Sequence, residues 1–299
     1  MRVLVTGASG FIGRRLCALL SGDGHEIWAL RRAGAAVPHA TATLCADLSS
    51  GPPDLTAAAP EAVVHLAGEA IGAGRWTAAR KNRLERSRVL ATRHLAEALA
   101  QLPKPPGIAV CASAVGYYGD RGDERLAESA GRGEGYLAEL CEAWEAESAK
   151  LLPGGRVAIF RFGMVIGPGG AAPRLFLPFR LGFGGPLGNG RQWVSWIALD
   201  DACGLVRFAL AHERVAGLLN GVAPEPLRSR DFARAVGRAL RRPSWLPAPA
   251  PLLSAAFGEM ARELLLSSQR AVPERAVQLG YRFAFPELPA ALSSVTLET

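Results

Sequence analysis

Residues 3–13 read Val-Leu-Val-Thr-Gly-Ala-Ser-Gly-Phe-Ile-Gly, and this stretch decides the fold. A short apolar run precedes three glycines at positions 7, 10 and 13, and apolar residues then recur at helical spacing. The pattern predicts a strand, a glycine turn and a helix. In that context Gly7 permits a tight turn, Gly10 lets the backbone approach a pyrophosphate, and Gly13 lets the helix pack closely on the strand. Free N–H groups at the helix N-terminus would face the same anion. A chance glycine turn is the alternative.

Further short apolar runs with the length of buried strands follow along the chain. They are Glu26–Leu30, Ala42–Cys45, Ala62–Leu66, Ile108–Cys111 and Val157–Phe160. Helical periodicity is strongest in Ala78–Leu102 and Tyr136–Leu152, between these runs. Continuous apolar strands that alternate with helices indicate a parallel sheet covered on both faces. The predicted fold class is α/β, a Rossmann-type doubly wound parallel sheet with a small, mainly helical C-terminal region.

The end of the second predicted strand selects the nucleotide. A site for NAD carries an acidic residue about 20 residues beyond the glycines, where it binds the ribose 2′-hydroxyl. Here the sequence has Arg31 and Arg32, whereas Glu26 lies at the start of that strand. An acid would repel a 2′-phosphate, but guanidinium groups bind phosphate through charge-assisted hydrogen bonds. The expected cofactor is therefore NADP(H), and the alternative is a pair of surface arginines in an arginine-rich protein.

Composition restricts the function classes. The chain has 299 residues, 49% of them apolar and 20% charged, with a net charge of +7, which is typical of a globular protein. We expect no membrane partner and a cytoplasmic location, because the sequence contains neither an apolar span nor a signal peptide. The basic residues form no long run, so nucleic-acid binding is not expected. The five scattered cysteines lack metal-ligand spacing, so we expect reduced core thiols and no metal site.

Longer motifs carry a resemblance to a known family. They are Asp47-Leu48, His65-Leu66-Ala67-Gly68-Glu69, Arg75-Trp76, Ser87-Arg88, Gly116-Tyr117-Tyr118-Gly119-Asp120, Cys141-x-x-Trp144-Glu145 and the segment from Leu177 to Gly190. Together with the glycine turn, they resemble the epimerase-family branch of the atypical extended short-chain dehydrogenases/reductases. This branch includes bacterial YfcH-type proteins and carries a C-terminal extension of unknown role, and the resemblance covers almost the whole chain. It implies an NADP(H) site built from the glycine turn and the ends of later strands. The expected contact residues are Gly7, Gly10, Phe11, Ile12, Gly13, Arg31, Arg32, Asp47, Leu48, Leu66, Ala67, Gly68, Arg88 and Met164.

The sequence lacks the catalytic pair that is typical of the superfamily. Superfamily enzymes use Tyr-x-x-x-Lys, in which the lysine lowers the pKa of the tyrosine. The chain has three lysines, Lys81, Lys104 and Lys150, and none has a tyrosine four residues earlier. Lys150 follows Tyr136 by about 21 Å along a helix, which is too far to assist it.

Candidates for the catalytic groups follow the fifth predicted strand. The resemblance assigns Ser113 to the catalytic serine, which would orient a carbonyl, and Tyr136 to the tyrosine. An unassisted phenol with a pKa of about 10 is a proton donor rather than a base at neutral pH, which favours reduction. Tyr117 and Tyr118 are rival donors because they lie closer to Ser113 in the sequence. For each tyrosine, the alternative is an aromatic ring packed in the cleft with a satisfied hydroxyl.

The sequence pattern changes after about residue 170. A glycine-rich loop runs from Gly182 to Gly190, and it either closes over the active face or merely connects two regions. Asp200 and Asp201 precede an apolar helix and are interpreted as its N-cap.

The sequence favours an NADP(H)-dependent oxidoreductase or epimerase-like protein that acts on an unidentified small carbonyl or sugar-related substrate. The missing lysine supports an alternative, a catalytically weak NADPH-binding sensor or regulatory module, and a sugar-nucleotide epimerase is a third interpretation. We expect residues 1–170 to bind the nucleotide. Residues 171–299 would form the substrate side and the C-terminal extension, with some segments returning to the sheet. A homodimer through the two predicted helices would follow the superfamily.

Overall fold

The computed structural model describes residues 1–32, 34 and 37–296, with side chains described through residue 293. Within these residues a seven-stranded parallel sheet has the order β11-β7-β5-β4-β1-β2-β3. Its strands are β1 (Arg2–Thr6), β2 (Glu26–Arg31), β3 (Ala42–Cys45), β4 (Ala62–His65), β5 (Ile108–Ala114), β7 (Arg156–Phe162) and β11 (Gly217–Gly221). This is the strand order of a Rossmann-type sheet, with its topological switch point between β1 and β4. The predicted fold class is confirmed.

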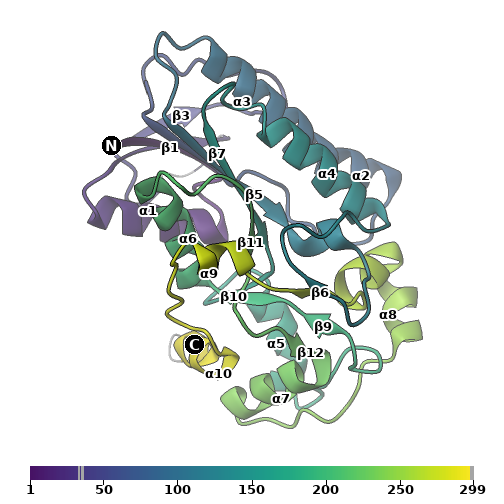
Figure 1. The fold of residues 1–299 in the computed structure, drawn as a ribbon. Helices are drawn as coiled ribbons and strands as arrows, with labels where there is room; N and C mark the ends of the chain where they lie inside the picture. Colours follow the sequence, from purple (N-terminus) through teal and green to yellow (C-terminus); the bar gives the residue numbers. More distant parts are fainter. Residues whose placement is uncertain (33, 35–36, 297–299) are drawn as a thin grey trace.

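Helices cover both faces of the sheet (Figure 1). On one face lie α1 (Phe11–Gly22) and α6 (Leu199–Ala211), and on the other lie α3 (Ala91–Ala100) and α4 (Tyr136–Ser148). All four residues of β4 are buried, because alternate side chains enter two apolar clusters, Val64 the first and Val63 the second. Double coverage explains why the strands read as continuous apolar runs.

The helix predicted over Ala78–Leu102 consists of three consecutive pieces. They are α2 (Ala78–Glu85), the π-helical turn η1 (Arg86–Leu90) and α3, which ends at Ala100. Thr77 begins α2 as a side-chain cap, because its hydroxyl accepts the Arg80 amide at 3.2 Å. A π turn inside a long helix changes which side chains face the sheet.

Most of the chain after residue 170 forms a smaller layer below the sheet in Figure 1. Its helical pieces are α5 (Ala172–Arg180), α7 (Ser229–Leu240), α8 (Ala250–Phe257), η3 (Ala261–Leu265), α9 (Glu274–Gln278) and α10 (Leu288–Thr296). Short strand pairs join it to the rest, namely β8 (Met164–Ile166) with β10 (Trp196–Ala198) and β6 (Arg125–Leu126) with β13 (Arg270–Ala271). The pair of β9 (Trp193–Val194) and β12 (Leu227–Arg228) lies within the layer itself. Helix α6 and strand β11 also follow residue 170, yet they belong to the sheet.

The interpretation of Asp200 and Asp201 as an N-cap is wrong. The N-cap of α6 is Ala198, and both acids lie inside the first turn. The Asp201 carboxylate is 1% exposed and accepts hydrogen bonds from the amides of Ala284 and Phe285, each at 2.8 Å. Asp201 therefore fastens the C-terminal segment to α6.

The glycine-rich loop packs against the segment that leads into α8. The Gly188 amide donates to the Ala248 carbonyl at 2.8 Å, and a Cβ at Gly185 would lie 2.0 Å from the Leu246 oxygen. These contacts favour the interpretation of the loop as a connection between two regions, because its glycines let the backbones of two chain segments lie close together.

The expectation of five core thiols is wrong at one position. All five cysteines are free, but Cys45 is exposed on β3, while the other four are buried. Burial raises the pKa of Cys111, Cys141 and Cys203 to about 12, so these thiols stay protonated.

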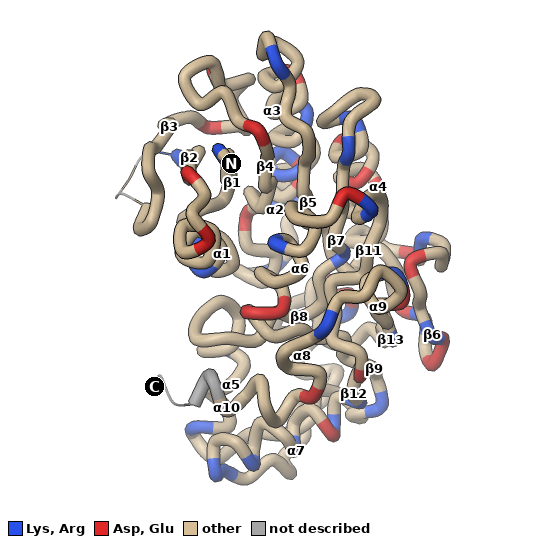
Figure 2. The backbone as a smooth tube through the Cα atoms, turned by 60° about the vertical axis from the view of Figure 1, so that its left-hand side comes forward, with Lys and Arg blue, Asp and Glu red and all other residues tan. Residues whose placement is uncertain are grey.

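Acidic and basic positions are interspersed over the fold, with several basic positions along α7 (Figure 2). Among the described residues, no helix combines the length and hydropathy that crossing a bilayer requires. In the same part of the chain, no three His, Cys, Asp or Glu side chains gather as a set that could hold a metal ion.

Candidate active site

The three glycines of the turn differ in what surrounds them. Gly7 has a φ of +69°, and a Cβ there would lie 2.7 Å from the carbonyl carbon and oxygen of Leu66. A Cβ at Gly13 would lie 2.2 Å from the Gly7 oxygen. Both positions therefore require glycine for the fold itself. Gly10 is exposed with a φ of −74°, and among the described residues a Cβ there would approach one atom, the Gly7 oxygen, at 3.0 Å. Its missing side chain leaves room for a ligand.

Helix α1 begins at this turn without a side-chain cap. Its N-cap is Gly10, no described side chain caps it, and its first turn holds no acidic residue. The Phe11 ring packs on the turn after β8, where a Cβ at Gly170 would lie 2.6 Å from it. The first-turn amides, which include those of Phe11 and Ile12, have no intrahelical acceptor. They and the positive end of the helix dipole are suited to an anion.

A buried chain of hydrogen bonds fixes the switch point. The Ala67 amide donates to Thr6 Oγ1 at 3.3 Å, and that hydroxyl lies 2.7 Å from His65 Nδ1. His65 Nε2 lies 2.9 Å from Thr92 Oγ1, which donates to the Arg88 carbonyl at 2.6 Å. Since Thr92 uses its proton there, we infer that His65 donates from Nε2 and accepts at Nδ1. Burial lowers the pKa of His65 to about 4, so the ring is neutral.

Arg31 and Arg32 lie at the end of β2, and Asp47 follows β3. Arg31 Nη1 donates to the Arg32 carbonyl at 3.3 Å, while its buried Nε has no partner within the described residues. Asp47 Oδ1 accepts from the amide and hydroxyl of Ser49 at 2.9 and 2.8 Å. Burial opposes ionisation of Asp47, but the Ser49 hydrogen bonds and the charge of Arg32 hold its pKa below the usual value. The β2 end therefore carries two cations beside one ionised acid.

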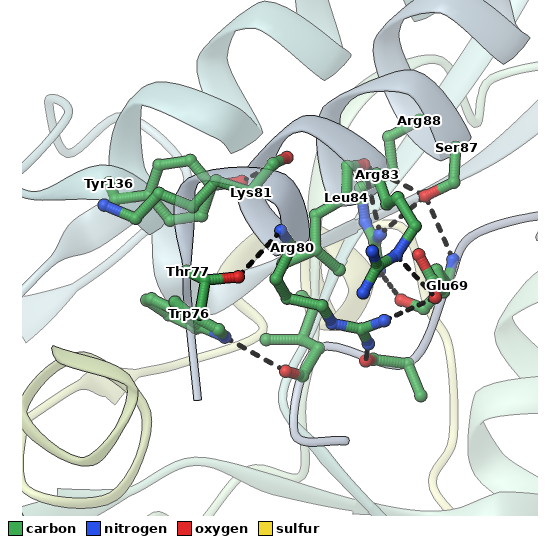
Figure 3. Close-up of polar contacts among 12 residues, drawn as sticks. Glu69, Trp76, Thr77, Arg80, Lys81, Arg83, Leu84, Ser87, Arg88 and Tyr136 are labelled. Atoms are coloured by element: carbon green, nitrogen blue, oxygen red, sulfur yellow. Dashed lines mark hydrogen bonds and ion pairs between the residues drawn. The ribbon is translucent and has the colours of Figure 1, made fainter. Parts of the chain in front are cut away.

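Arg88 lies beside Glu69, in the segment that follows β4 (Figure 3). Its guanidinium is buried, donates to the Glu69 carbonyl at 2.8 Å and to Ser87 Oγ at 3.2 Å, and lies 5.2 Å from the Trp144 ring centroid. A Cβ at Gly68 would lie 3.2 Å from it. Burial lowers the pKa of Arg88 to about 10, and its Nε has no partner in the described part of the chain. A buried cation with an unused donor favours a nearby anion.

The remaining expected contacts, Leu48 and Met164, differ in their surroundings. The Leu48 side chain is buried in the core, and its carbonyl lies 2.7 Å from His94 Nδ1. Met164 begins β8, where its amide donates to the Ser195 carbonyl at 2.9 Å.

Ser113 lies in a buried ion pair rather than in an open cleft. Its hydroxyl donates to Glu145 Oε1 at 2.6 Å, and Arg161 holds the same carboxylate through Nε and Nη2 at 2.8 and 2.7 Å. The Arg161 guanidinium lies 3.5 Å from the centroid of the Tyr117 ring and donates to the Tyr118 hydroxyl at 3.0 Å. The Ser113 proton is thus committed to Glu145 and is not free to orient a carbonyl. Tyr118 is fully buried, whereas the half-buried Tyr117 has no hydroxyl partner among the described residues.

Tyr136 begins α4 and points toward α2 (Figure 3). Its hydroxyl donates to the Lys81 carbonyl at 3.0 Å, and Lys81 Nζ lies 4.5 Å from its ring centroid. The Trp76 ring meets it edge-on at 5.3 Å. Burial raises the pKa of Tyr136 to about 12, so it is protonated at neutral pH. No hydrogen bond joins Ser113 and Tyr136 in the described part of the chain, because the Ser113 hydroxyl bonds to Glu145 and the Tyr136 hydroxyl to Lys81.

Sequence reasoning missed the partners of these residues. Lys81 reaches Tyr136 from another helix, where no Tyr-x-x-x-Lys pattern exists. One available signal is Arg161, a charged residue inside the apolar strand β7, because a buried arginine requires a counter-ion.

Comparisons with known proteins agree with this fold. Residues 3–220 match the NAD dependent epimerase/dehydratase family, and residues 248–295 match a domain of unknown function, DUF1731. The chain is 41% identical over 303 residues to epimerase family protein SDR39U1 of Bos taurus, covering 99% of each. It is 35% identical over 304 residues to epimerase family protein YfhF of Bacillus subtilis (strain 168), covering 99% of this chain and 98% of that protein.

A solved structure of a relative is similar over its whole length. The crystal structure of human epimerase family protein SDR39U1 (isoform 2) with NADPH has a TM-score of 0.90 and 36% identity, covering 100% of both chains. The family resemblance seen in the motifs is confirmed. The chain therefore belongs to the NAD dependent epimerase/dehydratase family and carries a DUF1731 region near its C-terminus.

Proposed function

We propose that this protein binds NADP(H) across the switch point between β1 and β4. The bound cofactor would serve an oxidoreductase or epimerase-like reaction on a small carbonyl or sugar-related substrate. The observation that carries the proposal is the glycine turn, open at Gly10, together with Arg31 and Arg32 at the end of β2. The human relative crystallised with NADPH supports the same cofactor.

The residues present fit a phosphorylated dinucleotide. The open face of Gly10 and the amides of α1 would hold the pyrophosphate, and the two arginines of β2 would hold the 2′-phosphate. The Nε atoms of Arg31 and Arg88, which have no partner among the described residues, are donors that such a ligand would satisfy. When bound, the nicotinamide supplies a hydride to the substrate.

The other expected contacts belong to the same proposal. They are Gly7, Phe11, Ile12, Gly13, Asp47, Leu48, Leu66, Ala67, Gly68 and Met164. In this division residues 1–170 hold the nucleotide, and residues 171–299 provide the substrate side.

A tyrosine hydroxyl would deliver the proton. Tyr117 is a better candidate than Tyr136, because its hydroxyl is unpartnered among the described residues, whereas that of Tyr136 is engaged by the Lys81 carbonyl. A protonated phenol gives its proton to the carbonyl oxygen as hydride reaches the carbonyl carbon, which yields an alcohol. Ser113 acts indirectly here, since it helps to fix the ion pair beneath the Tyr117 ring.

Nucleotide titration tests the proposal. The intrinsic fluorescence of the wild type and of the Arg31→Ala/Arg32→Ala variant would be followed with NADPH and with NADH. Loss of charge-assisted bonds to the 2′-phosphate is expected to raise the Kd for NADPH about 100-fold or more and to leave NADH unchanged. The variant Arg241→Ala/Arg242→Ala is a control for the change in net charge, because it also removes two adjacent arginines, which are exposed and lie far along the chain. Equal NADPH affinity in all three proteins would refute the assignment.

The assembly state is a second part of the proposal. Helices α3 and α4 lie side by side (Figure 1) and are joined by an ion pair between Arg93 and Glu147 at 3.0 Å. We expect these helices to pair in a homodimer, and light scattering that reports a monomer at all concentrations would contradict this.

A further inference from the structure

The first turn of α4 receives its cap from a distant part of the chain. Glu263, in η3, accepts the Tyr136 amide at Oε1 and the Leu137 amide at Oε2, at 3.1 and 2.8 Å. The N-cap itself is Gly135, which has no side chain and a φ of +102°. A Cβ at Gly135 would lie 2.9 Å from the Glu263 carboxyl carbon. The glycine therefore makes room for an imported carboxylate, which suits the positive end of the α4 dipole.

A second carboxylate from the same segment holds Lys81. Glu259 pairs with Lys81 Nζ at 2.7 Å, and this ammonium lies over the Tyr136 ring. Both side chains of the pair are about one-third exposed, at 31% and 33%. The ion pair thus fixes the position of Lys81 more than it stabilises the fold.

Apolar contacts complete the attachment of this segment. Met260 and Leu265 join the cluster that contains Trp76, Leu84 and Leu137. The Arg75 guanidinium also donates to the Ala255 carbonyl at 3.0 Å. Residues 255–265 therefore rest on α2 and on the start of α4 at once, so that movement of one element is transmitted to the others.

The start of α4 in turn supports the turn that carries Tyr117. That turn is η2 (Val115–Tyr118). A Cβ at Gly116 would lie 3.3 Å from Leu137 Cβ, so η2 and the capped turn of α4 are in close contact. A shift of Leu137 would displace the backbone next to Tyr117.

We propose that residues 255–265, within the region matched to a domain of unknown function, complete the active site. Glu263 is their positioning residue: it fixes the start of α4 and, through Leu137, the η2 turn. This role rests on the proposed function, because it assigns Tyr117 to the site.

The first test measures hydrogen exchange by mass spectrometry on the peptide that covers residues 133–140. In Glu263→Gln one of the two α4 amides loses its acceptor and meets an NH₂ group, so this amide is expected to exchange about tenfold faster or more. Glu287→Gln is the matched control, since Glu287 is exposed in the same region and makes no side-chain ion pair with the described residues. Unchanged exchange in Glu263→Gln overturns the proposal, and this readout needs no substrate.

The second test separates positioning from general destabilisation. With phenanthrenequinone as the probe substrate, Glu263→Gln is expected to lower kcat about tenfold or more while the Kd for NADPH stays within about twofold. Parallel loss of NADPH affinity and kcat would mean a structural role only and would overturn the proposal. If Glu263→Gln does not fold, Glu263→Asp, whose side chain is one methylene group shorter, is used with the same criteria. If the wild type fails to bind NADPH, the proposed function fails, while the exchange result still decides the role of Glu263.

Discussion

Substitution of the turn glycines by alanine separates the demands of the fold from those of the ligand. In Gly13→Ala, the new methyl carbon lies 2.2 Å from the Gly7 oxygen and 2.8 Å from the Ala8 Cα. Both are backbone atoms, so α1 must move away from β1. Overpacking of this kind costs about 1–3 kcal/mol, and a clash with rigid backbone belongs at the upper end. With an unfolding entropy of about 2.1 cal/mol/K per residue, 3 kcal/mol lowers Tm by about 5 °C for a chain of this length.

Gly10→Ala is expected to change the stability of the fold very little. The methyl approaches one described atom, at 3.0 Å, and a φ of −74° suits alanine. Alanine is a poorer N-cap than glycine, but it also restricts the unfolded chain, which stabilises by about 0.4–1 kcal/mol. These terms oppose each other, so the expected change in Tm is less than about 2 °C. The methyl nevertheless occupies the open face, and the Kd for NADPH is expected to rise at least tenfold.

The assay combines thermal unfolding followed by circular dichroism with NADPH titration of the same samples. Gly13→Ala should lower Tm by several degrees, and Gly10→Ala should lose affinity at an unchanged Tm. A large Tm loss in Gly10→Ala, or undiminished NADPH affinity in that variant, would refute the division of roles among the glycines.

Four further substitutions test the interior and the chemistry. Burial lowers the pKa of His65 to about 4 in the folded protein, compared with 6.5 in the unfolded chain. The neutral ring therefore contributes its whole share to the free energy of unfolding above about pH 6.5, and this share falls by about 3 kcal/mol as the pH is lowered toward 4. In His65→Gln, the free energy of unfolding measured in urea should lose this pH-dependent fall. The same pH dependence in the wild type and the variant would contradict a buried neutral His65 ring. Glu145→Gln leaves Arg161 without its counter-ion and should lower the free energy of unfolding in urea by about 3–5 kcal/mol. A decrease of less than about 1 kcal/mol would contradict a buried ion pair at this position. Tyr117→Phe should lower quinone reduction by about 10²–10⁴-fold at unchanged NADPH affinity, and Tyr136→Phe by less than about tenfold; the reverse order would exchange their roles.

Local sequence patterns were sufficient for most of the sheet and for the glycine turn. Short apolar runs predicted strands β1 and β4 because buried parallel strands are apolar on both faces. A similar run predicted the edge strand β3, although its residues are partly or fully exposed. Strand β11, with the sequence Gly-Leu-Leu-Asn-Gly, contains too much glycine and too few consecutive apolar residues for such a pattern. It forms because β7 offers an open edge at which its backbone can pair.

The side-chain networks were not predictable in the same way. Glu263 reaches Tyr136 across 127 positions of sequence, and Asp201 reaches Phe285 across 84. Neither contact leaves a local pattern, since a carboxylate that accepts backbone amides places no demand on the identity of its partners. Ser113 shows the related difficulty that a residue type expected at a catalytic position also serves as a donor inside a buried ion pair.

The central claim is that the β2 end selects a 2′-phosphate, and the ratio of Kd values for NADH and NADPH measures it most directly. We expect a ratio well above one in the wild type and a ratio near one in Arg31→Ala/Arg32→Ala, because the two nucleotides then share the same remaining contacts. A wild-type protein that binds NADH as tightly as NADPH, or a variant that keeps the full preference, would contradict it.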